Sequence, residues 1–445
     1  MPKINPKPLV GVLPCDEESI ILRSSPYFEL RYLIAKGTPE QSWAQQFLPF
    51  NKVHLYSLPA DRPSLEVNTF ADIFKYSNIA KVIRKNKIGY VWLTIDNDSR
   101  KDLYGVAKEY HFEIIGPTKI WQDNLENKIW FDQFLAKNGL PRPASQTISS
   151  PRNKVLLQSP LVLQTALSDG GEGTFFLKSS ADLKRILKLT TAKPDHYLLR
   201  EYVSGKPCGI TILCTSNIVA LSAVREQCFI EHKEGRPVFV GIQWIPSTSI
   251  KRRADLINRV FLRLGEILQQ GGFMGYANID FIISNTGAVR IIECNPRFSS
   301  STAQLALNPR LISNLQSGNL IIEEYLNKTV LSRQRKLPMP KSEYRGAVLH
   351  LDIDSREEFR VSRIHPVGVY QLKNKDIKFI SPDIRKIKQY HEFIYFSMIA
   401  LNERFIQNKA AGLIKANFPL FNSSGNINAA GKILVNHFGY DFKKS

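Results

Sequence analysis

The chain has 445 residues, which is too long for one ordinary hydrophobic core and predicts two or three domains. Hydrophobic residues make up 43% of it and charged residues 22%, a balance that is typical of a globular protein and excludes a disordered one. Sixty lysines and arginines against forty aspartates and glutamates give a net charge of +20, which suits partners that carry phosphate. The basic residues are dispersed and lack interleaved aromatic residues, so nucleic-acid binding is not favoured.

The sequence offers no segment for a membrane or for a disulfide framework. No stretch approaches the roughly 20 apolar residues that a bilayer-spanning helix needs, and the apolar run at residues 9–13 is too short for a signal-peptide core. The five cysteines are odd in number, widely separated and without CxxC spacing, which argues against disulfides and zinc. We expect a cytoplasmic protein with buried thiols and no membrane contact.

The first 120 residues alternate short apolar segments with helical ones. Strands are predicted at residues 9–13, 53–57, 88–95 and 112–115, with helices at 70–85 and 99–110. This alternation is typical of an α/β unit with a parallel sheet, and its layout is Rossmann-like. A glycine-rich dinucleotide fingerprint is absent, so nothing here indicates a dinucleotide site.

The middle of the chain reads as an antiparallel α+β region. A helix is predicted at residues 122–137, stopped by Asn138-Gly139. Strands are predicted at residues 161–164, 174–177, 197–201, 210–214, 218–229, 278–283 and 289–293, with helices at 181–189 and 253–270. The last of these helices has an apolar face that would cover a sheet.

The C-terminal part holds a strand-like run at residues 346–352 and a helix-like stretch at 384–408, without a chemical motif. It is interpreted as a smaller domain that completes a substrate site or forms an oligomer contact, such as a homodimer. The expected domains are residues 1–119, 120–195, 196–331 and 332–445.

The strongest chemical signal is a predicted hairpin that carries Asp280 on one strand and Glu293 and Asn295 on the other. Residues two apart on a strand share a face, so Glu293 and Asn295 point the same way and Asp280 can lie across from them. Two carboxylates and an amide oxygen are hard ligands that suit Mg²⁺. A hairpin with solvated polar residues is the alternative, but the apolar neighbours, the strand end at Pro296 and the guanidinium of Arg297 favour a site.

A second signal is the run Ser168-Asp169-Gly170-Gly171-Glu172-Gly173-Thr174 between two predicted strands. Its glycines let backbone N–H groups turn toward a phosphate, and Thr174 adds a hydroxyl. It is not a Walker loop, because no Gly-Lys-Ser/Thr follows and no helix begins there. An ordinary hairpin turn remains an alternative.

Together these motifs resemble the ATP-grasp family over residues 9–307. Gly116-Pro117, Asn127-Lys128 and Gly139-Leu140-Pro141 are similar to that family's entry into its ATP-binding region. The spacing of the hairpin ligands is similar to that of D-alanine:D-alanine ligase. The Asn-Pro-Arg sequence and the following hydroxyl-rich run look more like carbamoyl-phosphate synthetase and biotin carboxylase. The resemblance implies an ATP-grasp fold, of mixed α/β and α+β class, with a Rossmann-like N-terminal domain and a smaller C-terminal domain.

The resemblance also implies roles for particular residues. Asp280, Glu293 and Asn295 would hold one or two Mg²⁺ ions, or Mn²⁺ in their place, on the phosphates of ATP. Arg297 would stabilise the transferring phosphoryl group, and Lys128 would contact the nucleotide phosphates. The implied adenine linker, read through backbone groups, is Arg200, Glu201, Tyr202 and Val203. The implied phosphate-covering loop is formed by Gly170, Gly171, Gly173 and Thr174.

The chain departs from the family pattern at two positions. Gln164 stands where many members have a lysine in the strand before the glycine loop, so a charged phosphate contact is replaced by a neutral amide. The acid that often follows the linker glycine is also missing, because Gly205 precedes Lys206-Pro207.

The expected activity is that of an ATP-dependent carboxylate-amine ligase, which activates a carboxylate as an acyl phosphate, joins it to an amine and releases ADP and phosphate. Amino acids or small peptides are the substrates that the family suggests. Arg225, on the predicted strand 218–229, would orient the substrate carboxylate, unless it is a surface arginine paired with Glu226 or Glu231. The alternatives for the whole chain are an ATP-dependent kinase or phosphotransferase, an inactive nucleotide-binding relative, and a basic nucleic-acid-binding protein.

Overall fold

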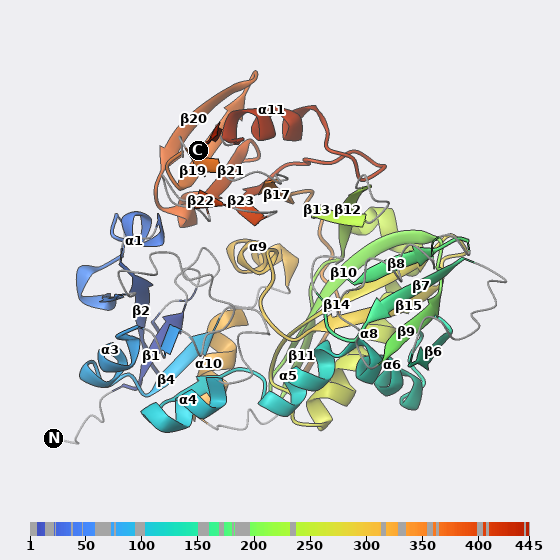
Figure 1. Ribbon diagram of the computed structural model, residues 1–445, viewed down its shortest axis with the longest axis horizontal. Helices are drawn as coiled ribbons and strands as arrows, with labels where there is room; N and C mark the ends of the chain where they lie inside the picture. The colour runs from blue at the N-terminus through green and yellow to red at the C-terminus, as the bar shows by residue number, and fades with distance from the viewer. Residues whose placement is uncertain are drawn as a thin grey trace.

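Over the residues that it describes, the computed structural model shows three larger sheets and one small sheet, with helices packed between and beside them (Figure 1). The residues it describes are 7–13, 22, 24–36, 39–46, 48–57, 73–74, 77–93, 103–149, 160–168, 173–179, 182, 196–231, 237–312, 317–327, 335–353, 359–361, 365–397, 404–405, 409–439 and 442–444. No helix in this part of the chain is long and apolar enough to cross a membrane.

The N-terminal sheet is parallel, with five strands in the order β3-β2-β1-β4-β5. Its strands are β1 (Leu9–Leu13), β2 (Glu29–Ala35), β3 (Val53–Tyr56), β4 (Tyr90–Leu93) and β5 (Glu113–Ile115). Its helices are α1 (Pro39–Ala44), α3 (Ile79–Lys85) and α4 (Leu103–Tyr110). The predicted parallel α/β unit is therefore confirmed, with β2 as an additional strand that the sequence reading did not identify.

The helix predicted at residues 122–137 is wrong as a single element. It is divided at Asn127 into α5 (Lys119–Glu126) and α6 (Lys128–Lys137). The side-chain oxygen of Asn127 accepts hydrogen bonds from the backbone nitrogens of Ile129 and Trp130, each at 3.0 Å, and so caps a new helix. This cap places Lys128 in the first turn of α6.

A four-stranded antiparallel sheet follows, in the order β6-β9-β7-β8. Its strands are β6 (Ser145–Ile148), β7 (Leu161–Thr165), β8 (Thr174–Leu177) and β9 (Tyr197–Glu201). The three strands predicted here are confirmed, and β6 is additional. The helix predicted at residues 181–189 lies outside the described residues, apart from residue 182.

A twelve-stranded sheet forms the middle and the C-terminal part of the molecule. Its first half contains β10 (Gly205–Cys214), β11 (Ile218–Leu221), β12 (Arg225–Glu231), β13 (Pro237–Trp244), β14 (Gly275–Ser284), β15 (Val289–Asn295) and β16 (Arg335–Leu337). One strand was expected at residues 218–229, but the chain forms two, β11 and β12. The long amphipathic helix α8 (Ala254–Gln270) is confirmed, and its buried face covers β10 and β14 through Phe261 and Leu264.

The same sheet continues into the C-terminal region, because β13 pairs with β17 (Ala347–Ile353). Its further strands are β19 (Gly368–Lys373), β20 (Asp376–Ser381), β21 (Glu392–Ser397) and β23 (Lys409–Ala416). Strands β18 (Phe359–Val361), β22 (Arg404–Phe405) and β24 (Phe442–Lys444) form the small sheet, and α11 (Ala429–Phe438) is the last helix. The strand predicted at residues 346–352 is confirmed.

The helix predicted at residues 384–408 is wrong. The region instead contains the short 3₁₀ helix η5 (Ile384–Lys386) followed by β21 and β22. All six residues of β21 are buried between β19 and β23, and its β-branched and aromatic side chains suit that position better than a helix. Strand pairing within the sheet thus outweighs the local helical pattern.

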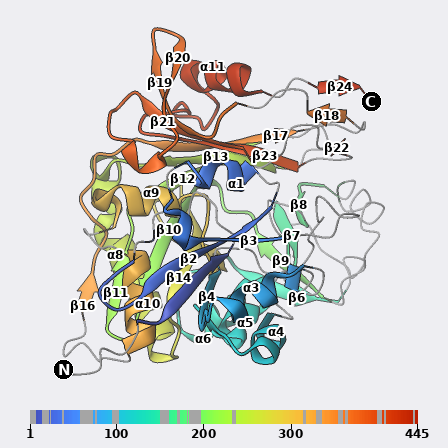
Figure 2. The ribbon, with the colours of Figure 1, turned by 90° about the vertical axis from the view of Figure 1, so that its left-hand side faces the viewer.

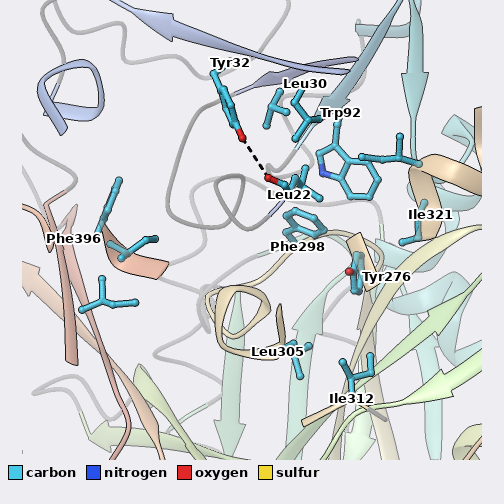
Figure 3. Packing of buried hydrophobic residues seen from close by; sticks show 14 of the residues in the cluster. Leu22, Leu30, Tyr32, Trp92, Tyr276, Phe298, Leu305, Ile312, Ile321 and Phe396 are labelled. Atoms are coloured by element: carbon cyan, nitrogen blue, oxygen red, sulfur yellow. Dashed lines mark hydrogen bonds between the residues drawn. The ribbon is translucent and has the colours of Figure 1, made fainter. Parts of the chain in front are cut away.

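A shared apolar cluster joins the N-terminal sheet to the rest of the molecule. Helices α9 (Thr302–Leu307) and α10 (Ser317–Asn327) lie within it, between the parallel sheet and the twelve-stranded sheet (Figures 1 and 2). Trp92 of β4 packs against Phe298 with ring centroids 5.2 Å apart, and Tyr276 packs on the same ring at 5.0 Å (Figure 3). This cluster therefore holds the end of β4 against the segment that follows β15.

Candidate functional site

The predicted ligand residues come together on one face of the β14–β15 hairpin. Asp280 is the direct cross-strand partner of Glu293, and Asn278 is the partner of Asn295. Asn295 Nδ2 lies 3.4 Å from Glu293 Oε1, so the amide and the carboxylate of β15 touch one another. The two carboxylates and the amide that the sequence singled out are thus neighbours in space.

A β-bulge in this hairpin sets which way the ligands point. Asp280 pairs with Glu293 but Phe281 pairs with Ile291, so Ile292 is an extra residue on β15. Without the bulge, strict alternation would put Glu293 on the same face as the buried Ile291. The extra residue reverses the alternation, so Glu293 and Asn295 leave the core face and Cys294 takes it. The sequence reading used simple alternation and did not identify this bulge.

The pKa values of the two paired carboxyl groups are shifted in opposite directions. Burial, followed by the charge of Glu293, raises the pKa of Asp280 to about 7, against the opposing charge of Arg225. Burial also acts to raise the pKa of Glu293, but the charge and hydrogen bond of Lys128 prevail and hold that pKa below its ordinary value. Lys128 Nζ lies 3.2 Å from Glu293 Oε2. A half-buried pair of acids, with Lys128 beside one and the charge of Arg225 acting on the other, offers oxygen ligands to which a divalent cation is suited.

The hairpin offers few side chains that could bind a metal ion. The described residues contain no group of three or more His, Cys, Asp and Glu side chains arranged for a metal ion. The ligands that the hairpin offers are therefore two carboxylates and the amide oxygen of Asn295, which fits Mg²⁺ because that ion usually keeps several waters and substrate phosphates. It does not fit a site closed entirely by protein ligands.

Lys128 links the hairpin to the glycine loop. Its ammonium group is buried and donates to the backbone oxygen of Ser168 at 2.7 Å, as well as pairing with Glu293. Gly173 has φ +67°, a left-handed conformation that favours glycine, and a side chain there would collide with Thr165 Oγ1. Thr174 follows as the first residue of β8, while Gly170 and Gly171 lie outside the described residues.

The expected adenine linker runs from the end of β9. The backbone nitrogens of Glu201 and Tyr202 already donate to Ala144 and Pro160, at 2.9 and 3.0 Å. The side chain of Tyr202 is 46% exposed and its ring packs edge-on against Phe176. Backbone reading of adenine by this segment therefore stays a prediction that depends most on Val203.

Arg225 lies inside the protein, which makes the alternative of a surface arginine wrong. Its side chain is 3% exposed, and its terminal nitrogens donate to Thr211 Oγ1 at 3.0 Å and Asn278 Oδ1 at 3.1 Å. Burial lowers the pKa of Arg225 to about 10, although the charge of Asp280 opposes this change. Glu226, the suggested surface partner, pairs with Lys206 at 2.7 Å. Contact of Arg225 with a substrate carboxylate stays a prediction.

Arg297 lies at the end of the ligand strand. Its Nε is 3.7 Å from Glu126 Oε1, and its Nη2 is 3.5 Å from Asn295 Oδ1. Its backbone oxygen accepts from Asn278 Nδ2 at 2.5 Å. The sequence reading missed Asn278 and Glu126; Asn278 was detectable because it alternates with Asp280 on the same strand, whereas Glu126 carries no local signal.

The chain is similar to known proteins both in sequence and in structure. Residues 125–301 match the family model of the ATP-grasp domain. The N-terminal section of the carbamoyl phosphate synthase large chain of Methanopyrus kandleri is 25% identical over 242 residues, which are 51% of this chain and 42% of that protein. The chain thus spans about two fifths of the length of that curated relative.

Solved structures share the fold over nearly the whole chain. The biotin carboxylase domain dimer of Hydrogenobacter thermophilus 2-oxoglutarate carboxylase, solved with MgADP, ADP and bicarbonate, has a TM-score of 0.66 at 10% identity and covers 98% of this chain and 90% of its own. The ADP complex of PurK, an N5-carboxyaminoimidazole ribonucleotide synthetase, has a TM-score of 0.55 at 14% identity and covers 97% of both chains. The resemblance inferred from the motifs is confirmed: the protein has the ATP-grasp fold, and its residues 125–301 belong to the ATP-grasp domain family.

Proposed function

We propose that the protein is an ATP-dependent ligase that activates a carboxylate as an acyl phosphate and transfers the acyl group to an amine, releasing ADP and phosphate. The observation that carries this proposal is the direct pairing of Asp280 with Glu293 beside Lys128. The pair offers oxygen ligands for a magnesium ion, and the lysine connects it to the glycine loop. This combination suits the handling of a nucleotide polyphosphate.

The residues fit Mg²⁺ and ATP on their own chemistry. The two carboxyls face one another on adjacent strands, and burial followed by the charge of Glu293 raises the pKa of Asp280 although the charge of Arg225 opposes this change. When bound, Mg²⁺ would neutralise charge on the nucleotide phosphates and on the phosphoryl group in transfer. Mn²⁺ prefers similar oxygen ligands and would substitute for it.

The remaining site residues then have separate tasks. Lys128, freed from Glu293 and Ser168, would contact the phosphates as a point charge. Arg297, at the end of the ligand strand, would stabilise the transferring phosphoryl group. Arg225 would hold Asn278 and the face of the sheet in place, or contact the carboxylate after rearrangement. Closure of the loop from Gly170 to Gly173, of which the structure describes only Gly173, would exclude water from the acyl phosphate.

The substrates follow from chemistry and from the neighbours. Amino acids or small peptides are proposed as the carboxylate and the amine. Bicarbonate belongs among the candidate carboxylates, because the H. thermophilus neighbour was solved with it. That neighbour is described as a dimer, and we extend to this chain the proposal of a cytoplasmic homodimer, which sedimentation of the full chain would test.

The first experiment measures Mg²⁺-dependent release of ADP, AMP and phosphate from ATP. Amino acids, small peptides and bicarbonate are offered singly and with amines, and the wild type is compared with Glu293→Gln. Glu226→Gln is the matched control, because Glu226 lies on the same sheet and pairs with Lys206 outside the ligand group. We expect substrate-dependent ADP and phosphate in the wild type and the control, and loss of both products in Glu293→Gln.

Three outcomes would contradict the proposal. AMP as the product would show that the acyl-phosphate mechanism is wrong. A phosphorylated product formed without any amine would identify a kinase or phosphotransferase. Binding of ATP without turnover on every substrate combination would favour the inactive nucleotide-binding relative.

A further inference from the structure

The side chain of Arg200 occupies the centre of a buried polar network between the four-stranded sheet and α6. Its Nη1 donates to Gln164 Oε1 at 2.8 Å, and its Nη2 lies 3.3 Å from Asp132 Oδ1. Gln164 Nε2 in turn donates to Thr174 Oγ1 at 3.2 Å. The guanidinium is therefore connected through one amide to the residue that ends the glycine loop.

The charges of this network do not cancel. Asp132 is shared by two arginines, since Arg142 Nη1 also approaches its Oδ2, at 3.2 Å. One carboxylate between two guanidiniums leaves one positive charge in excess. Arg142 is 25% exposed on its side chain and is accessible to solvent, whereas Arg200 is 2% exposed and shares Asp132, with the charge of Glu293 also acting on it. A buried charge without full compensation is costly unless a partner arrives.

One nitrogen of the Arg200 guanidinium, Nε, is buried and lacks a hydrogen-bond partner within the described part of the chain. Buried donors are almost always satisfied, so an orphaned guanidinium nitrogen indicates a partner that is bound at another time. The charge of Glu293 also acts on Arg200, so the guanidinium is within electrostatic range of the β14–β15 hairpin.

We infer that the guanidinium of Arg200, rather than the backbone of its segment alone, binds the phosphate groups of the nucleotide and supplies the positive charge that Gln164 cannot. The inference rests on the proposed nucleotide site and names a further residue in it. The neutral Gln164 then has a clear use, because its carbonyl oxygen fixes one edge of the guanidinium and its amide nitrogen fixes Thr174. A lysine at position 164 would repel Arg200.

The experiment measures the affinities of the full-length protein for ADP and for adenosine by calorimetry. Arg200→Gln removes the charge and keeps a polar side chain, and Arg142→Met is the matched control that also loses a contact to Asp132. Because charge-assisted hydrogen bonds are the stronger class, we expect ADP affinity to fall roughly 10- to 100-fold in Arg200→Gln with adenosine affinity unchanged. In Arg142→Met, both affinities should stay within about threefold of the wild type, because Arg142 is partly exposed and its polar contacts are with Asp132, Ser145 and Pro143 rather than with Gln164 or Thr174.

A second variant moves the positive charge from position 200 to position 164. Gln164→Lys combined with Arg200→Gln should restore ADP affinity to within about fivefold of the wild type, and it keeps the test valid if Arg200→Gln alone does not fold. The inference is overturned if Arg200→Gln binds ADP as the wild type does, if it loses ADP and adenosine equally, or if the double variant recovers nothing. A wild type that binds no ADP would overturn the proposed function as well, whereas a wild type that binds ADP and forms it from ATP in the ligase assay would leave that function intact.

Discussion

The packing of Arg225 against Gly209 predicts a large effect of a single methyl group. Gly209 lies between Arg225 on β12 and Asp280 on β14, as the cross-strand partner of both. A Cβ atom at Gly209 would be 2.9 Å from Arg225 Nε and 3.0 Å from its Cζ. Ordinary contacts of a Cβ are 3.4 Å or longer, so Gly209→Ala requires the guanidinium to move by about half an ångström.

An unconstrained arginine side chain could make this movement at little cost in free energy, but Arg225 is constrained. The terminal nitrogens of Arg225 are held at 3.0 and 3.1 Å by Thr211 and Asn278, and its Cζ lies 6.0 Å from the centre of the Trp244 ring. A shift of about half an ångström takes both hydrogen bonds to the limit of useful geometry. Because hydrogen bonds to charged groups contribute about 1.5–3 kcal/mol each, partial loss of two predicts a destabilisation of about 1–3 kcal/mol.

The assay is urea unfolding followed by circular dichroism, with the ligase assay in parallel. Gly209→Ala should lower the free energy of unfolding by about 1–3 kcal/mol and also reduce turnover, because the side chain of Asn278, two residues from Asp280 on β14, is displaced. Gly105→Ala is the control for the same chemical change, since a Cβ there meets open space. A Gly209→Ala protein within about 0.5 kcal/mol of the wild type and fully active would refute the claim that Arg225 is fixed.

Three further predictions concern stability. Gly105 lies within α4 with room for a side chain, so Gly105→Ala should raise the free energy of unfolding by up to about 1 kcal/mol, and a loss in urea unfolding would contradict this. Phe261 is fully buried with its ring 4.7 Å from that of Phe281, so Phe261→Ala should cost about 3–5 kcal/mol by the same measurement, and a cost below about 1 kcal/mol would show that the core collapses around the site. Burial, helped by the charge of Lys415, lowers the pKa of His350 to about 4, so the folded state resists protonation. The stabilisation that neutral His350 contributes is then fully present above its unfolded pKa near 6.5 and is lost as the pH falls toward 4, by up to about 3 kcal/mol. His350→Phe should flatten this part of the plot of unfolding free energy against pH. An unchanged plot would contradict the assignment.

The sequence predicted the parts of the fold that depend on local pattern. Alternating apolar segments identified the parallel sheet, and the amphipathic spacing identified α8. The helix predicted at residues 384–408 is wrong because this part of the fold depends on contacts between segments that are distant in the sequence. The residues of β21 are stabilised as a strand by β19 and β23, which come from distant parts of the chain and cannot be seen in a local window.

The candidate site likewise has one feature that the sequence predicted and one that it did not. The spacing of Asp280, Glu293 and Asn295 was sufficient to place them together, because a hairpin is a local structure. The bulge at Ile292 was not predictable from alternation, although it decides which face Glu293 takes. Without it the acid would point into the core beside α8, and the same sequence motif would carry no site.

Helix α6 explains how two sheets that are separate in the sequence share one site. Lys128 and Asp132 are four residues apart on α6 and therefore lie on the same side of the helix. Lys128 contacts Glu293 of the twelve-stranded sheet, and Asp132 contacts Arg200 of the four-stranded sheet. The distance between the ligand hairpin and Arg200 is thus set by one turn of a helix that begins at the Asn127 cap. The cap that breaks the predicted helix is consequently what aligns the candidate metal ligands with the charge of Arg200, the proposed phosphate-binding group.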